Sequence, residues 1–545
     1  MTTQTWETIS ANKRAQRDAL IPDEWKVDVP ESVVNVIDVP RTSGILSPAE
    51  VKITETDAPT LVKQILAKEL TSEAVTLAFS KRAAIAQQLT NCLTEIFFTE
   101  ALETAKKIDA EYAATGKALG PLHGLPVSLK DNFNIKGIDT TVGFVAWANE
   151  PQQYESEMTK IMRESGAVLF CKTNVPTAMM MAESYNNVWG YTTNPYNRKT
   201  SAGGSSGGEG ALLALKGSPL GVGTDIGGSI RIPSALNGIY GLKPSFGRFA
   251  TFGARSGMPG QEAVRSINGP MSSDLESVEL WSKTVVDTKP WERDPNMLPI
   301  PWREVELPQQ LAFGLILDNG IVRPTPPVTR ALLETKAALE KAGHKVIVWS
   351  PYEALKAQGL LERFFVGDGG VKIASFIEAG SEPWPAALAP YKEAHDKRAS
   401  APPLVGDLWS LQAERTAYAK GALDHWMASK SLTGTGRPFD GVITPVTAYS
   451  APPHHTFEHV SYTSMWNITD QSSVVFPVGF ATPNDAKPSG GIGEYRSDME
   501  KRIWERYDPQ EIAGAPVSLQ VVTARLEEEK AIKLAGVIAA ALADK

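Results

Sequence analysis

Two clusters of glycine and serine, separated by apolar residues, constrain this chain more than any other feature of its sequence. They are Gly203-Gly-Ser-Ser-Gly-Gly208 and Gly227-Gly-Ser229, within residues 199–234. Between them lie a run over 209–216 that is typical of a helix and an apolar run over 219–223 that is typical of a buried strand. The glycines therefore occupy turns between buried elements, which argues against a flexible linker.

Other uses of glycine-rich turns fit this centre less well. A P-loop needs Gly-Lys-Ser or Gly-Lys-Thr after its glycines, and Gly221, Gly223 and Gly227 miss the dinucleotide-binding spacing by one residue. The nucleophile-elbow pattern G-x-S-x-G occurs at Gly203 and Gly204, but it arises easily in such a tract, and the seven histidines offer no obvious base. Hydrolytic chemistry at this centre is expected to proceed without histidine.

Short apolar runs alternate with helical segments along much of the chain. This alternation predicts an α/β fold with a largely parallel sheet. The predicted strands cover residues 126–130, 167–171, 219–223, 311–317 and 345–349, and the predicted helices cover 157–165, 209–216 and 328–342. In a final helix, one apolar stripe must pack against the body of the protein: Leu534, Val537, Ile538, Ala541 and Leu542.

Composition limits the partners and the compartment. The net charge is −8, and no cluster of lysine and arginine could track phosphates, so nucleic acid is not an expected partner. Cys92 and Cys171 lie in apolar stretches and predict two buried thiols in a reducing compartment. The first residues do not form a secretory leader, and no apolar stretch approaches the roughly 18 residues of a membrane span. A cytoplasmic protein without a membrane partner is expected.

The centre of the chain resembles the amidase signature family. That family is recognised by Gly-Gly-Ser-Ser-Gly-Gly followed by Gly-Thr-Asp-x-Gly-Gly-Ser-x-Arg-x-Pro, and this chain carries both parts intact. Ser229 lies 24 residues after Ser205, and Lys130 lies 75 residues before Ser205, as in the family. Within it, segments 21–27, 43–47 and 81–92 are similar to those of fungal acetamidases.

The resemblance implies the architecture and the catalytic groups. It implies a single large α/β/α domain with a central mixed, largely parallel sheet flanked by helices. Residues 1–60, rich in charges and prolines, are expected to form an N-terminal helical arm, and residues 61–545 the catalytic domain. In related enzymes Ser229 is the nucleophile, Lys130 is the base, and Ser205 passes the proton between them across a cis peptide at Gly204–Ser205.

Lys130 must be uncharged to act as a base. It ends the apolar run 125–129, so we expect it to point from a buried strand into a dry site where its pKa is depressed. The competing interpretation is a structural lysine paired with Asp131. Only the spacing of the family motifs favours the base.

The second glycine cluster predicts an oxyanion hole. Residues without side chains let successive amides converge on one point, and we assign this role to the amides of Ile226, Gly227, Gly228 and Ser229. Asp225 and Arg231 are expected to form a structural ion pair. Ser206 has two open interpretations, a hydrogen bond within the hole or a helix cap.

The predicted substrate pocket rests on weaker signals. Met179, Tyr185 and Trp466 are candidate lining residues, with ordinary core packing as an equally open alternative. His454, His455 and His459 lie near two prolines without a completing carboxylate or cysteine, so no metal and no cofactor are expected.

The function that follows is hydrolysis of a small aliphatic or aryl carboxylic amide, such as acetamide, to an acid and ammonia. Cleavage of carbamates or esters by the same acyl-enzyme is the alternative. An amidase-like docking protein is disfavoured because the lysine and both serines are present, and an amidotransferase subunit would require an obligate partner. The expected partner is the small-molecule amide itself, and a homodimer is compatible with the sequence.

Overall fold

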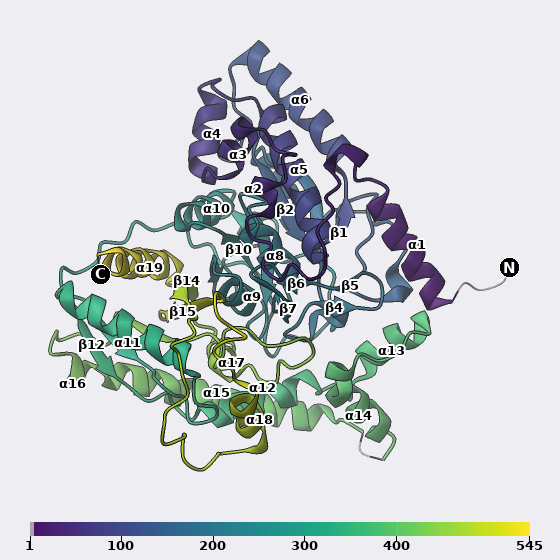
Figure 1. The fold of residues 1–545 in the computed structure, drawn as a ribbon. Coiled ribbons are helices and arrows are strands. Elements are labelled where there is room, and N and C mark those ends of the chain that lie inside the picture. The colour runs from purple at the N-terminus through teal and green to yellow at the C-terminus, as the bar shows by residue number, and fades with distance from the viewer. Residues whose placement is uncertain (1–4, 401, 545) are drawn as a thin grey trace.

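An 11-stranded sheet runs through the molecule, and helices flank it (Figure 1). The computed structural model describes residues 5–400 and 402–544. In spatial order the strands are β1 (Leu93–Ile96), β3 (Val168–Thr173), β2 (Pro126–Lys130), β8 (Gly221–Asp225), β10 (Ile267–Ser272), β9 (Tyr240–Lys243), β14 (Ser473–Phe480), β15 (Pro516–Val522), β13 (Gly441–Pro445), β11 (Ala312–Leu315) and β12 (Lys345–Val348).

The predicted α/β class and the mixed sheet are confirmed, but the sheet is less parallel than expected. Parallel pairing occurs at β3–β2, β2–β8, β13–β11 and β11–β12, which is four of the ten neighbouring pairs. The central strands pair antiparallel. One cause is the connection between β9 and β10, which contains no helix and therefore does not make the crossover that parallel neighbours need.

Helices and short strands complete the fold. Two small hairpins are formed by β4 (Tyr185–Asn186) with β5 (Gly190–Tyr191) and by β6 (Thr193–Asn194) with β7 (Asn197–Ser201). The helices of the first half are α1 (Trp6–Asp18), α2 (Val39–Thr42), α3 (Pro48–Thr54), α4 (Ala58–Leu66), α5 (Ser72–Thr90), α6 (Phe98–Thr115), α7 (Glu157–Glu164), α8 (Gly207–Ala214) and α9 (Arg231–Leu236). Those of the second half are α10 (Leu275–Asp287), α11 (Pro326–Lys341), α12 (Ala354–Phe365), α13 (Val371–Gly380), α14 (Ala389–Lys397), α15 (Val405–Ala428), α16 (Lys430–Thr433), α17 (Ser461–Ile468), α18 (Asp498–Arg506) and α19 (Glu528–Ala543). Among the described residues, no helix combines the length and the apolar character needed to cross a membrane.

Local sequence signals place several of these boundaries. The Thr71 side chain accepts a hydrogen bond from the Ala74 amide and caps α5. Gly166 has a φ of 91° just after α7, where a residue with a side chain would be strained. In the apolar stripe of α19, Leu534, Ile538 and Ala541 are buried and Val537 and Leu542 are partly buried, as its spacing predicts.

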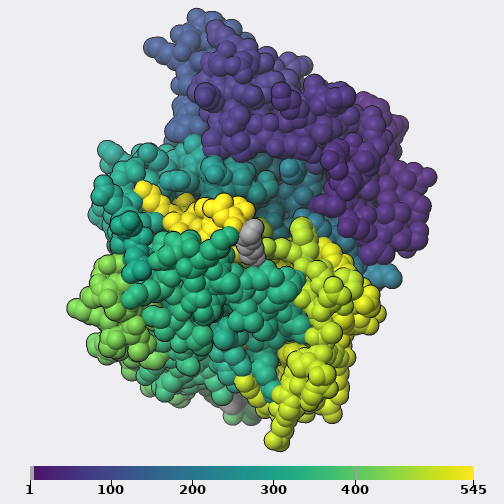
Figure 2. Space-filling model, turned by 60° about the vertical axis from the view of Figure 1, so that its left-hand side comes forward, coloured from purple at the N-terminus to yellow at the C-terminus, as the bar shows by residue number. Residues whose placement is uncertain are grey.

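The described N-terminal segment, which contains α1, lies at one end of the molecule, shown in purple in Figure 2. Helix α1 packs there through charged side chains as well as through Trp6 and Ile9, which contact a small hydrophobic cluster. Lys13 Nζ contacts Glu95 (2.7 Å) and Asp139 (2.9 Å), and Arg17 donates to the Leu93 carbonyl (2.9 Å). Because these cations are also buried, the apolar residues of the helix reveal only part of its packing face.

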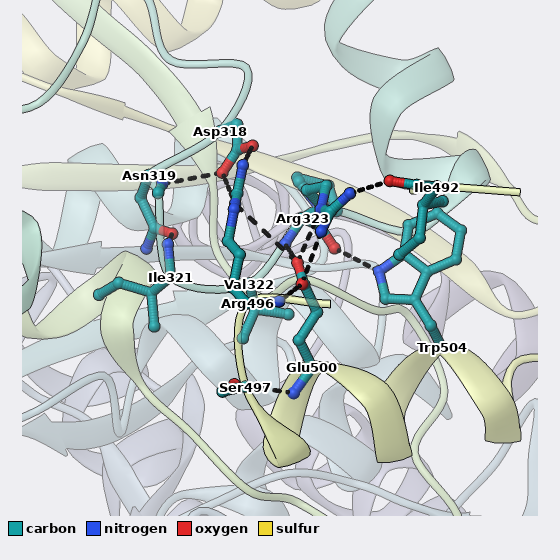
Figure 3. A network of polar contacts seen from close by, with 12 residues as sticks. Asp318, Asn319, Ile321, Val322, Arg323, Ile492, Arg496, Ser497, Glu500 and Trp504 are labelled. Atoms are coloured by element: carbon teal, nitrogen blue, oxygen red, sulfur yellow. Dashed lines mark hydrogen bonds and ion pairs between the residues drawn. The ribbon is translucent and has the colours of Figure 1, made fainter. Parts of the chain in front are cut away.

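A buried carboxylate joins two distant segments in the C-terminal half (Figure 3). Glu500 in α18 is fully inaccessible and accepts hydrogen bonds from the Arg323 side chain (2.9 Å) and from the Arg496 amide (2.7 Å). Trp504 donates to the Arg323 carbonyl (3.0 Å). Burial alone would raise the pKa of Glu500, but the hydrogen bonds from Arg323 and Arg496 and the charge of Arg323 outweigh it and hold the pKa below its ordinary value. This network ties the loop before α11 to α18.

We predict that Glu500→Gln lowers the free energy of unfolding by about 3 kcal/mol, because Arg323 loses its anionic partner. Urea unfolding followed by circular dichroism measures this. Since the folded pKa is depressed, the difference from wild type is fully present above the ordinary glutamate pKa of about 4.3 and is lost as the pH falls through the folded value. The control is Glu505→Gln, an exposed glutamate of the same helix. Equal effects of the two substitutions would contradict the prediction.

Candidate active site

Lys130 lies where two neighbouring parallel strands end. Strand β2 pairs with β3 in register Lys130↔Thr173, so Lys130, the last residue of β2, lies beside the end of β3. Its side chain is fully buried. Lys130 Nζ donates to Ser205 Oγ (2.7 Å) and to Thr224 Oγ1 (2.6 Å). Open α/β sheets generally bind their ligands at such strand ends.

The surroundings of Lys130 favour its neutral form. Burial lowers its pKa to about 7, against the opposing attraction of Asp225, Glu209 and Asp131. Within residues 5–400 and 402–544, the Lys130 amine forms no ion pair; Asp131 is paired instead with Lys172 (3.6 Å). The interpretation of Lys130 as a lysine salt-bridged to Asp131 is therefore not supported.

Ser205 lies in the turn that precedes α8. The Gly204–Ser205 peptide is cis, as the family resemblance implies. The neighbouring Ser206 neither caps α8 nor lies free for a ligand: its hydroxyl donates to the Thr224 carbonyl (3.4 Å) and accepts from the Thr224 amide (3.4 Å). Ser206 therefore joins this turn to the end of β8.

Ser229 lies in the turn between β8 and α9, next to the turn of Ser205. The Ser206 amide donates to the Ser229 carbonyl (3.1 Å), which holds the two serine-bearing turns together. Ser229 is 9% exposed, and it lines a cavity together with Gly204. Of the sequence-predicted triad, the structure thus brings Lys130 and Ser205 into direct contact and places Ser229 in the adjoining turn.

The peptide between Gly227 and Gly228 is fixed at both edges. Thr463 Oγ1 donates to the Gly227 carbonyl (2.6 Å), and the Gly228 amide donates to Asp225 Oδ1 (2.8 Å). A side chain at Gly228 would meet Thr463 at 2.5 Å, and its φ is 135°. The predicted oxyanion hole therefore needs correction at Gly228, because its amide is already bonded within the loop.

The other backbone amides of the loop over residues 226–229 have no hydrogen-bond acceptor among the described residues. The Gly228 carbonyl accepts from the Ile232 amide (2.7 Å), and because a peptide is planar and trans, this turns the Ser229 N–H away from α9. In the described part of the chain, the amides of Ile226, Gly227 and Ser229 donate to no protein acceptor. Clustered free amides of this kind can hold an anion.

A buried ion pair supports the loop from behind. Asp225 and Arg231 are both inaccessible and lie 3.0 Å apart, and Asn467 bonds to both, at 2.8 Å and 2.5 Å. Burial alone would raise the pKa of Asp225, but the charge and hydrogen bond of Arg231 and the amide of Asn467 hold it well below its ordinary value. The expected structural role of this pair agrees with the geometry.

The cavity beside Ser229 has a volume of about 210 Å³ and is mostly apolar. Met179 lines it, as predicted, together with Met180 and Met181. Tyr185 and Trp466 do not: Tyr185 packs against Tyr191 and His455, and Trp466 is buried in the hydrophobic core against which the lining residues Ile226 and Phe365 pack.

Sequence reasoning missed the opposite wall of this cavity. Phe365 and Val366, at the end of α12, and Tyr391, in α14, complete it. Both helices lie more than 100 residues after the serine motifs, and α14 lies far from the sheet in Figure 1. No local pattern marks them, so only the three-dimensional fold brings them to the site.

A second missed residue is the buried Glu209 in α8. Its carboxyl accepts from Ser128 (2.7 Å) and Thr173 (3.0 Å), and it has no ion pair in the described residues. Burial raises its pKa to about 8, although these hydroxyls and the charge of Lys130 oppose the shift. A glutamate directly after a glycine cluster could have been flagged as unusual, but its burial was not readable from the sequence.

Together these groups can perform acyl transfer. A buried amine with a lowered pKa contacts one serine hydroxyl, a second serine lies in the adjoining turn, and free amides lie in the same loop as the second serine. Such a set can activate a hydroxyl and stabilise the negative charge that develops on an attacked carbonyl oxygen.

Comparisons with known proteins agree with this geometry. A family model described as Amidase matches residues 74–532. The chain is 41% identical to an acetamidase of Emericella nidulans, covering 98% of this chain and 97% of the relative, and 39% identical to an acetamidase of Aspergillus oryzae, covering 98% of each. A solved structure of a fatty acid amide hydrolase superposes with a TM-score of 0.93 at 34% identity, covering 99% of this chain and 95% of that one.

We predict that Asp225→Asn lowers the free energy of unfolding by about 3–5 kcal/mol, because Arg231 is left as a buried charge without its anion. The control is Asp396→Asn, which breaks an exposed pair with Lys392 and should cost under about 1 kcal/mol. Chemical denaturation of both variants measures the difference. A loss for Asp225→Asn as small as that of the control would show that the pair does not support the loop.

Proposed function

This chain belongs to the amidase signature family, and we propose that it hydrolyses small carboxylic amides, acetamide among them, to the acid and ammonia through an acyl-enzyme on Ser229. Its family and its relatives identify it as a hydrolase of amide carbon–nitrogen bonds. The observation that carries the proposed mechanism is the buried contact between Lys130 Nζ and Ser205 Oγ at 2.7 Å.

The proposed proton path runs from Ser229 through Ser205 to neutral Lys130. As Ser229 Oγ bonds to the carbonyl carbon, its proton moves to Ser205 while the Ser205 proton moves to Lys130. The path then runs in reverse and delivers a proton to the departing nitrogen as its bond to carbon breaks. Water later attacks the acyl-enzyme by the same route, which releases the acid and restores Ser229. The lowered pKa of Lys130 supports this assignment.

We assign the oxyanion hole to the amides of Ile226, Gly227 and Ser229. Their freedom from other acceptors supports this, and removal of one such donor typically costs roughly 3 kcal/mol of transition-state stabilisation. The Gly228 amide positions the loop instead. Its hydrogen bond to Asp225 holds the loop in the shape that leaves the other amides free.

The size of the cavity supports small acyl groups. At about 210 Å³ it is smaller than the roughly 300–1,000 Å³ typical of sites for drug-sized ligands. Methionines adapt their shape to irregular apolar groups, so Met179, Met180 and Met181 suit short aliphatic or compact aryl substituents.

We also propose that the protein acts in a reducing compartment such as the cytoplasm. Cys92 and Cys171 are both buried and free, which supports this location because thiols persist where disulfides are reduced.

Ser229→Ala is expected to abolish ammonia release from acetamide, a loss of at least about a thousandfold, because the nucleophile is removed. Ser375→Ala, which removes an exposed hydroxyl on α13, is the control and should retain activity. A serine-reactive phosphonate should add mass at Ser229 in the wild type. Retained amide turnover in a folded Ser229→Ala variant, or labelling at another serine, would refute the assignment. Matched carbamates and esters in the same assay show whether amides are preferred.

The activity should depend on pH through Lys130. Because the base must be neutral, kcat/KM should rise about tenfold per pH unit below the pKa of about 7 and level off above it. Initial rates of acetamide hydrolysis between pH 5 and 9 test this. A profile that keeps rising to pH 10 would indicate a lysine with its ordinary pKa and would contradict the proposal.

A further inference from the structure

A second cavity, larger than the one beside Ser229, lies between β7, the segment 449–453 and α18. Its volume is about 380 Å³, and it shares no lining residue with the cavity beside Ser229. Much of its wall is apolar, formed by Val34, Pro452, Pro453, Ile503 and Ile512. The proposed hydrolysis makes no use of it.

One buried hydroxyl in this cavity lacks a partner. Ser450 is 4% exposed, and its Oγ forms no hydrogen bond to any described residue, although buried hydroxyls are normally bonded. The hydroxyls around it are already used: Tyr449 accepts from the Glu458 amide, and Thr325 donates to the Ala448 carbonyl. Ser450 thus contributes an unsatisfied buried hydroxyl to the wall of this largely apolar cavity.

The charges at the cavity favour an anion. The Lys199 ammonium has no acidic partner among the described residues. Arg506 donates to the Thr456 carbonyl (3.2 Å) and contacts Glu458 at 3.4 Å, which leaves its Nε–H without an acceptor. Among the described residues that line the cavity, Glu511, which is exposed, is the only one with a carboxylate.

The floor of the cavity connects to the turn that carries Ser205. The Ser201 amide donates to the Pro452 carbonyl (2.9 Å), and Thr200 forms a β-bridge with Pro453. Ser201 Oγ in turn accepts from the Gly203 amide (2.9 Å), two residues before Ser205. A molecule that orders segment 449–453 would therefore restrict the start of the catalytic turn.

We propose that this cavity binds a small carboxylate with an apolar tail, and that the bound molecule steadies residues 199–205. The tail lies against the proline and isoleucine side chains, while the carboxylate accepts hydrogen bonds from Ser450 and from the cationic side chains. Hydrogen bonds between a carboxylate and a cation are among the stronger polar contacts. The proposal does not depend on turnover at Ser229.

Hydrogen exchange read by mass spectrometry tests the proposal with three probes of one length: hexanoate, 1-hexanol and hexylammonium. Hexanoate should slow exchange in peptides covering 196–206 and 448–453, 1-hexanol should do so less, and hexylammonium least. The method locates binding and needs no catalytic activity, so its result is independent of the proposed amidase reaction. Equal effects of all three probes, or protection by hexanoate confined to residues 179–182 and 226–229, would overturn the proposal.

Two variants make the test specific. Lys199→Gln and Ser450→Ala should each weaken hexanoate binding by about fivefold or more, because each removes one hydrogen-bonding partner of the carboxylate. The control is Lys63→Gln, an exposed lysine on α4 outside the cavity, which should leave the affinity unchanged. Titration of hexanoate against exchange in 448–453, which shares no residue with the cavity beside Ser229, gives the affinities. Unchanged affinity in both cavity variants would contradict the assignment.

Discussion

The site depends on a buried amine, that of Lys130, which has no counter-ion among the residues that the structure describes. Lys130 is surrounded by hydroxyl and carbonyl oxygens rather than by a paired carboxylate, and burial disfavours its charged form. A lysine exposed to water would stay protonated at neutral pH and could not accept a proton. Lys130 is buried because it extends from β2, which lies between β3 and β8 in the sheet.

A second constraint acts on the backbone rather than on a side chain. The Asp225–Arg231 pair and Thr463 bind opposite sides of one loop, so the Gly227–Gly228 peptide has a fixed orientation. The side chains of Asp225, Arg231 and Thr463 thus fix the orientation of backbone amides. This arrangement requires glycine at position 228, because a side chain there would meet Thr463. A change that breaks this buried ion pair is therefore expected to disturb the shape of the proposed oxyanion hole as well.

The sequence predicted those parts of the site and of the fold that depend on the spacing of residues within a motif or a single element. Motif spacing identified Lys130 and Ser205, which contact each other, and the apolar runs located β2, β3 and β8. The sequence did not predict features that depend on packing between segments far apart in the chain. The antiparallel centre of the sheet, the walls contributed by Phe365 and Tyr391, and the bond that occupies the Gly228 amide all depend on segments far apart in the chain. Such contacts leave no periodic or local signal.

The most direct test of the account is a titration of Lys130 itself. Carbon-13 NMR of protein labelled at the lysine Cε, with the signal assigned by its loss in Lys130→Met, follows the charge on this amine as the pH is raised from 5 to 11. We predict a midpoint near 7, about three units below that of an exposed lysine. A midpoint above 10 would show that Lys130 is charged at neutral pH and cannot serve as the base.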